Sequence, residues 1–202
     1  MDKEQLLESL RMKGFSEEII DAFRKVRRED FVLDHLKSYA YEDMALPVES
    51  GTTLSQPYTI AFMLSLLEPK QHQKILEVGS GSGYVLSLIS EIIKNGELYG
   101  IEINKRLAFI SKERLLKDSN IQIFQKQGSL GLQEKAPFDR ILISAAFQKR
   151  EMLLPFIQQL DDPGILVAPV QSSLFQIKKD AGNITEKEFP GFAFVPIRTQ
   201  EE

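Results

Sequence analysis

A glycine-rich turn at residues 77–84 carries the clearest chemical signal in the sequence. It reads Glu-Val-Gly-Ser-Gly-Ser-Gly-Tyr, with an apolar stretch before it and a helical pattern after it. Glycines at a strand-to-helix turn allow tight curvature and close approach of a ligand to the backbone. Glu102 ends the next apolar stretch, about 20 residues on, where an acid reaches a ribose hydroxyl. The two features together predict a site for a cofactor that contains adenosine.

The details of this turn favour S-adenosylmethionine over a dinucleotide. A dinucleotide fingerprint would place its third glycine at position 84, where this chain has Tyr84. Glu77 would put a negative charge beside a pyrophosphate, whereas S-adenosylmethionine has no phosphate and carries two cationic groups that an acidic rim favours. Two alternatives stay open: Glu77 bonds the amides of the turn itself, or the turn binds no ligand.

The elements that would position these residues follow an α/β pattern. Apolar spacing predicts two short helices between Lys3 and Val26, the second capped by Ser16, and a helix from Pro57 to Leu67. Strands then alternate with helices, which predicts βαβ units and a mostly parallel sheet. Three further strands in succession predict an antiparallel C-terminal edge. The expected strands are 75–78, 98–103, 121–124, 138–143, 164–170, 173–178, 184–189 and 192–197, and the expected helices among them are 82–93, 105–117 and 152–160.

Composition limits the class of protein. With 202 residues, 43% of them apolar, the chain can bury one core. A net charge of -4 does not favour nucleic acid as a partner. The absence of cysteine excludes disulfides, thiolate metal sites and a cysteine nucleophile, and the two histidines lack metal-ligand spacing, so no metal is expected. Without a signal peptide or a membrane-spanning apolar run, we expect a soluble cytoplasmic protein, most simply a monomer.

The segment before the glycine turn is more specific than the turn itself. It contains Ala40-Tyr41-Glu42-Asp43, Leu46-Pro47 and the run Gly-Thr-Thr-Leu-Ser-Gln-Pro-Tyr at 51–58. Together with residues 75–84, 136–139 and 194–197, these motifs make the chain resemble the protein-L-isoaspartate O-methyltransferases from about Val26 almost to the C-terminus. The resemblance implies a Rossmann-like S-adenosylmethionine methyltransferase sandwich with a seven-stranded sheet, and methyl transfer to the free carboxylate of L-isoaspartyl residues in damaged proteins or peptides. One domain is expected, with N-terminal helices and the substrate loop in 1–73 and the cofactor-binding core in 74–202.

The resemblance also assigns roles to individual residues. Ser55 is the expected active-site hydroxyl, which would position the acceptor, since a carboxylate is already ionised and needs no general base. Asp43 and Arg198 are candidate substrate contacts. On spacing alone, Ser55 could instead cap the helix that Pro57 opens, and Asp43 could lie in a solvated turn. The loop around donor and substrate is expected to contain Thr52, Thr53 and Leu54. The donor is expected to contact Glu77, Gly79, Ser80, Gly81, Gly83 and Glu102, with Gln127 and Gly128 at the adenine.

Three positions depart from the family pattern. Lys126-Gln127-Gly128 stands where the family has Gly-Asp-Gly, Pro163-Gly164 replaces a glycine pair, and Arg198 follows Val-Pro-Ile where a threonine is usual. Arg198 motivates one alternative function, a methyltransferase acting on another carboxylate or a small molecule. Lys126 and Gln127 motivate another, a donor-binding homologue without turnover. The basic run at residues 24–28 is expected to be the solvated end of a helix.

Overall fold

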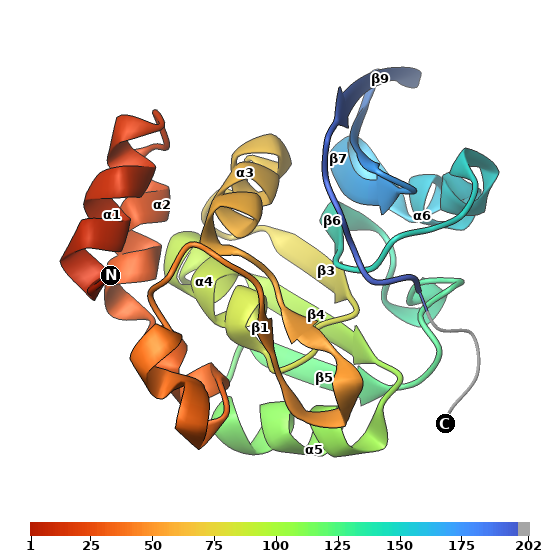
Figure 1. The fold of residues 1–202 in the computed structure, drawn as a ribbon. Helices are drawn as coiled ribbons and strands as arrows, with labels where there is room; N and C mark the ends of the chain where they lie inside the picture. Colours follow the sequence, from red (N-terminus) through yellow and green to blue (C-terminus); the bar gives the residue numbers. More distant parts are fainter. Residues whose placement is uncertain (198–202) are drawn as a thin grey trace.

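The architecture is a seven-stranded sheet between helices, in a computed structural model that describes residues 1–197 (Figure 1). The strand order is β5-β4-β3-β6-β7-β8-β9. The strands β3 to β7 pair in parallel, and β8 and β9 add antiparallel ladders at one edge. The predicted mixed sheet is therefore confirmed. The strands are β3 Lys74–Val78, β4 Glu97–Glu102, β5 Ile121–Gln125, β6 Phe138–Ile143, β7 Leu160–Val170, β8 Ser173–Asp180 and β9 Asn183–Pro190.

The prediction of a last strand at 192–197 is wrong. Beyond Pro190 the backbone turns at Gly191, whose φ is +96°, and leaves the sheet. The segment, dark blue in Figure 1, runs back to the carboxyl end of β6, where Pro196 and Ala146 make an isolated parallel bridge. Proline has no N–H to donate to a ladder, so Pro190 and Pro196 disfavour a continuous strand here.

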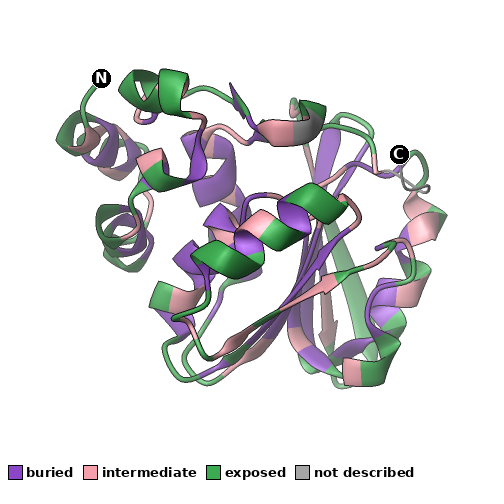
Figure 2. Cartoon of the chain, turned by 90° about the horizontal axis from the view of Figure 1, so that it is seen from below, coloured by how far each residue is buried: buried purple, intermediate pink, exposed green. Residues whose placement is uncertain are grey.

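Alternate residues along the strands feed two hydrophobic clusters, one on each face of the sheet. In β7, Ile165 and Val167 join the cluster that also holds residues of α3, α4 and α5, while Leu166 and Ala168 join the cluster around α6. Figure 2 shows the buried strands between partly exposed helices. These helices are α3 Pro57–Leu67, α4 Tyr84–Ile93, α5 Lys105–Arg114 and α6 Leu154–Gln158. The predicted helix 152–160 is shorter because a 3-10 turn, η5 Arg150–Leu153, precedes it and β7 already begins at Leu160.

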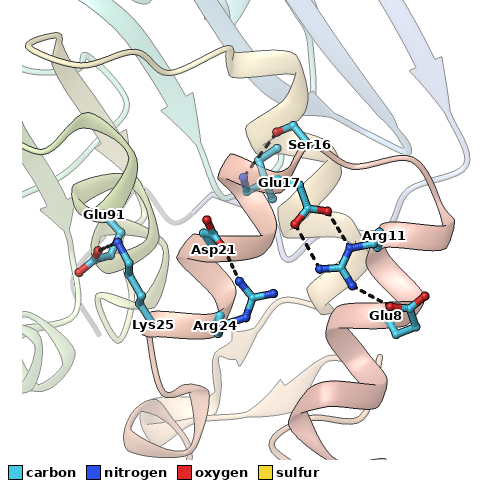
Figure 3. A network of polar contacts seen from close by, with 9 residues as sticks. Glu8, Arg11, Ser16, Glu17, Asp21, Arg24, Lys25 and Glu91 are labelled. Atoms are coloured by element: carbon cyan, nitrogen blue, oxygen red, sulfur yellow. Dashed lines mark hydrogen bonds and ion pairs between the residues drawn. The ribbon is translucent and has the colours of Figure 1, made fainter.

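Two N-terminal helices, α1 Lys3–Met12 and α2 Glu17–Lys25, form a hairpin beside α4. The predicted cap is confirmed, since Ser16 Oγ accepts a hydrogen bond from the Ile19 amide. Arg11 bridges Glu8 and Glu17 across the hairpin, and Lys25 reaches Glu91 on α4 at 3.0 Å (Figure 3). Within residues 1–197, no helix has the length and apolar character needed to cross a membrane.

The chain between α2 and α3 folds into short turns and one small hairpin. Its elements are η1 Arg28–Phe31, η2 Asp34–Tyr39, β1 Leu46–Pro47, η3 Glu49–Gly51 and β2 Thr53–Leu54. One member of the basic run contradicts the expected solvated helix end, because Arg28 is fully buried. Its guanidinium lies 5.3 Å from the centre of the Tyr84 ring and donates to the Met44 carbonyl. Burial lowers the pKa of Arg28, and the side chain helps to hold the hairpin strand that follows Met44.

Candidate functional site

The candidate site lies where the strand order reverses, between β3 and β6. In an open α/β sheet, the connections that leave the carboxyl ends of these two strands run to opposite faces and leave a crevice. The glycine turn follows β3 here, and the amides of Gly79 and Ser80 both donate to the Ile101 carbonyl of β4, at 2.8 and 3.0 Å. Gly81 has a φ of +52°, a conformation that side-chain-bearing residues rarely adopt. The turn is thus fixed against β4, the strand that carries Glu102.

Glu102 joins the glycine turn to the start of α5. One carboxylate oxygen accepts a hydrogen bond from the Gly81 amide and the other accepts one from the Asn104 amide, both at 2.8 Å. Asn104 in turn caps α5 by accepting a bond from the Leu107 amide. A carboxylate offers about four lone-pair sites, so two of them stay free for hydroxyl donors. Glu102 is 6% exposed and faces a cavity.

This cavity, called the donor cavity below, has walls from three parts of the chain. The loop from Gly51 to Thr53 forms one wall, the ends of β3, β4 and β6 form the floor, and the C-terminal segment 195–197 closes another side. Among the predicted site residues, those that line the donor cavity are Thr52, Thr53, Gly79, Gly81, Glu102 and Gly128. A Cβ on Gly128 would lie 2.5 Å from Val78 Cγ1, so only glycine lets the backbone approach β3 this closely. In the described part of the cavity wall, no side chain is basic.

A smaller inner cavity lies behind the glycine turn, toward α3 and α4. It is lined by further predicted residues, namely Leu54, Ser55, Glu77 and Ser80. Glu77 is 1% exposed, and one of its oxygens accepts a hydrogen bond from Ser144 Oγ at 2.7 Å. Its other oxygen and Ser80 Oγ have no hydrogen-bond partner within residues 1–197. The alternative in which Glu77 bonds the amides of the turn is thus not what the structure shows.

Burial makes Glu77 an unusual acid. Removal from water disfavours the ionised form and raises its pKa to about 8, the nearby charge of Glu102 adds to this, and the bond from Ser144 opposes it. The carboxyl is therefore mostly protonated near neutral pH while no cation lies beside it. A positive group brought into the inner cavity would favour the ionised form.

Ser55 stands at the entrance to a third space, the acceptor groove, of about 650 Å³ between the first turn of α3 and residues 191–196. Helix α3 has Gln56 in its capping position, and its Tyr58 amide donates to Asp43 Oδ1 at 2.8 Å. The alternative in which Ser55 caps α3 is therefore wrong. Asp43 takes that role from 15 residues upstream, and its part in substrate binding stays a prediction.

Three other predicted residues lie elsewhere. Gly83 ends the glycine turn and is the N-terminal capping residue of α4, with a φ of +86°. Gln127 is exposed and is absent from the described wall of the donor cavity, although its neighbour Gly128 belongs to it. Arg198 lies outside the described residues. The roles of Gln127 and Arg198 therefore stay predictions.

Ser144 was not predicted from the sequence as a site residue. It directly follows β6, and it shares with Thr53 a place in the walls of the donor cavity, the inner cavity and the acceptor groove. The signal was present, because the residue after the fourth parallel strand must meet the residue after the first at a topological switch. Residues 195–197 were also missed as cavity residues, because they were expected to pair within the sheet.

The fold and this crevice define a Rossmann-like α/β domain with a site at its topological switch, and solved structures share its fold. A protein-L-isoaspartate O-methyltransferase structure superposes with a TM-score of 0.87 at 24% identity over 96% of this chain and 65% of its own. A second structure comes from Plasmodium falciparum and is described as a putative protein-L-isoaspartate O-methyltransferase in complex with S-adenosyl-L-homocysteine. It superposes with a TM-score of 0.84 at 24% identity, over 99% of this chain and 100% of its own.

The sequence comparisons then define the family. The model for protein-L-isoaspartate(D-aspartate) O-methyltransferases matches residues 1–202. A protein-L-isoaspartate O-methyltransferase of Dictyoglomus turgidum is 36% identical over 97% of this chain and 90% of its own length. The protein-L-isoaspartate O-methyltransferase of Pyrobaculum islandicum is 37% identical over 96% of this chain and 98% of its own length. The chain belongs to the protein-L-isoaspartate(D-aspartate) O-methyltransferase family.

Proposed function

We propose that this protein transfers the methyl group of S-adenosylmethionine to the free carboxylate of L-isoaspartyl residues in damaged proteins and peptides. The observation that carries the proposal is that Thr53 and Ser144 line both the donor cavity and the groove that contains Ser55, so the two spaces share a wall. A methyl transfer needs only that donor and acceptor meet in line with water excluded. Family membership supplies the acceptor class, since the relatives above are named for it.

The residues of the donor cavity suit S-adenosylmethionine. Glu102 would accept from the ribose hydroxyls with its free lone pairs, and Gly128 would let the flat adenine approach the backbone. Glu102 lines the donor cavity, and Glu77, with its unpartnered oxygen, lines the inner cavity next to it, so two carboxyl groups lie near the place of a cationic ligand. When bound, the donor supplies a methyl group already activated on sulfonium sulfur.

The acceptor side needs orientation more than acid or base chemistry. Ser55 does not cap α3, so its hydroxyl is available to donate a hydrogen bond to the isoaspartyl carboxylate. Thr53 and Ser144 would border the reacting atoms at this shared wall. Walls from residues 191–196 would exclude water from the groove. We further propose that the protein acts as a single cytoplasmic domain and as a monomer, a proposal that its cysteine-free composition and its one seven-stranded sheet support.

The test is methyl transfer from labelled donor to two peptides that differ only in an isoaspartyl or an aspartyl linkage. We expect labelling of the isoaspartyl peptide alone, and loss of most of it in Ser55→Ala. Equal labelling of both peptides would favour an acceptor other than isoaspartate. Donor binding without transfer to either peptide would favour a homologue without turnover, the alternative that Lys126 and Gln127 motivate.

A further inference from the structure

Five aromatic rings form a continuous row beside the acceptor groove. Neighbouring ring centres are 5.7, 6.2, 5.2 and 6.4 Å apart along the row, and every ring is partly exposed. The row comes from three separate parts of the chain, which are the turn before α2, helix α3 and the C-terminal segment. In order along the row, its members are Phe15, Tyr58, Phe62, Phe192 and Phe194.

The aromatic row is continuous with the place where the acceptor would react. Tyr58, Phe192 and Phe194 line the same groove as Ser55. Tyr58 also lines a second hollow, of about 490 Å³, together with Phe15 and Phe62. Cavities of about 300 to 1,000 Å³ bury whole small molecules in proteins, so a groove of about 650 Å³ has room for more than one carboxylate and its side chain.

The spacing of the rings matches that of side chains on an extended peptide. Residues i and i+2 of such a peptide lie about 7 Å apart and point to the same side, which is close to the distance between adjacent rings. Aromatic rings with an exposed face also favour apolar contact partners. Because Ser55 lines the same groove as Tyr58, Phe192 and Phe194, a side chain two positions from a peptide residue held at Ser55 can reach a ring of the row.

We propose that the aromatic row binds a bulky apolar side chain of the acceptor peptide two positions from the isoaspartyl residue, and so sets which damaged sites are methylated fastest. The proposal rests on the proposed function, because it takes Ser55 as the reaction point. The occupant is the substrate peptide itself, since the row and the reaction point share one groove. Phe192 is the central contact, as it lies both in the groove and against Phe62 on α3.

The test uses three isoaspartyl peptides, one with glycine on both sides and the others with leucine two positions before or after the isoaspartyl residue. One leucine peptide should have a KM at least about fivefold below that of the glycine peptide, as expected for about 1 kcal/mol of partial leucine burial, with kcat unchanged. With Phe192→Ala, the KM of the leucine peptide should equal that of the glycine peptide measured with the same variant, and donor affinity should stay unaffected. Phe109→Ala, an exposed phenylalanine on α5, is the matched control.

The outcomes separate the two proposals. Methylation of the glycine peptide with the same KM for all three peptides would overturn the aromatic row and leave the proposed function standing. No methylation of any isoaspartyl peptide would overturn the proposed function. If Phe192→Ala does not fold, Phe192→Leu keeps apolar packing against α3 and should weaken the preference. An equal rise in KM for all three peptides with either variant would assign Phe192 a structural role only.

Discussion

Replacing Glu77 by glutamine should remove a large part of the pH dependence of stability. In the folded protein, burial raises the pKa of Glu77 from 4.5 to about 8. Between these values the unfolded chain has lost the proton that the folded chain still holds. The free energy of unfolding therefore falls as pH rises through this window. One pKa unit corresponds to about 1.4 kcal/mol. The free energy of unfolding of the wild type therefore falls by about 5 kcal/mol across the whole window through this group, and that of Glu77→Gln does not fall through it.

Denaturant unfolding at several pH values measures this effect. The free energy of unfolding of Glu77→Gln, relative to the wild type, should rise by about 4 kcal/mol between about pH 5 and pH 8. The amide oxygen can still accept the bond from Ser144 Oγ, so the fold should persist. Glu113→Gln makes the same chemical change at an exposed site on α5 and serves as control. A constant difference between Glu77→Gln and wild type at every pH would refute the assignment of Glu77 as a buried neutral acid.

Four further substitutions test the site. Glu102→Gln replaces one of two acceptor oxygens that hold backbone amides, so calorimetry should show donor affinity reduced about ten- to a hundredfold, with Glu113→Gln unchanged. Ser55→Ala should lower kcat and leave donor affinity and melting temperature intact, whereas Asp43→Ala should cost about 1 kcal/mol of stability by thermal melting. Similar melting of these two variants would contradict the capping assignment. Gln127→Asp should tighten donor binding about fivefold, about 1 kcal/mol, and an unchanged dissociation constant would remove Gln127 from the adenine site.

The sheet and the glycine turn could be predicted because their determinants are local. Each parallel strand is a short apolar run followed by a helical pattern, and both signals lie within about 20 residues. The segment 192–197 has the same β-type composition but does not join the sheet. Whether it pairs or crosses the site depends also on Pro190 and on Phe62 of α3, which packs against Phe192, and neither Pro190 nor Phe62 belongs to the segment.

Individual side chains were harder to assign where their partners are distant in sequence. Ser55 precedes Pro57 and has the composition of a cap, yet Asp43 supplies the cap from across the hairpin. Arg28 belongs to a basic run typical of a solvated helix end, yet Tyr84 and the Met44 carbonyl enclose it. Sequence spacing places a residue on an element, whereas these contacts depend on how separate elements pack.

The contact between the hairpin loop and α5 bears on how the spent donor leaves. Glu49 and Arg106 form an ion pair at 3.0 Å, with 38% and 65% of their side chains exposed. This pair ties to α5 the loop that forms one wall of the donor cavity, so movement of that wall away from α5 breaks the pair. Exposed ion pairs contribute about 0 to 1 kcal/mol and weaken as salt is added. Opening the donor cavity at this loop therefore requires little free energy. If product release limits turnover, moderate ionic strength should accelerate the enzyme.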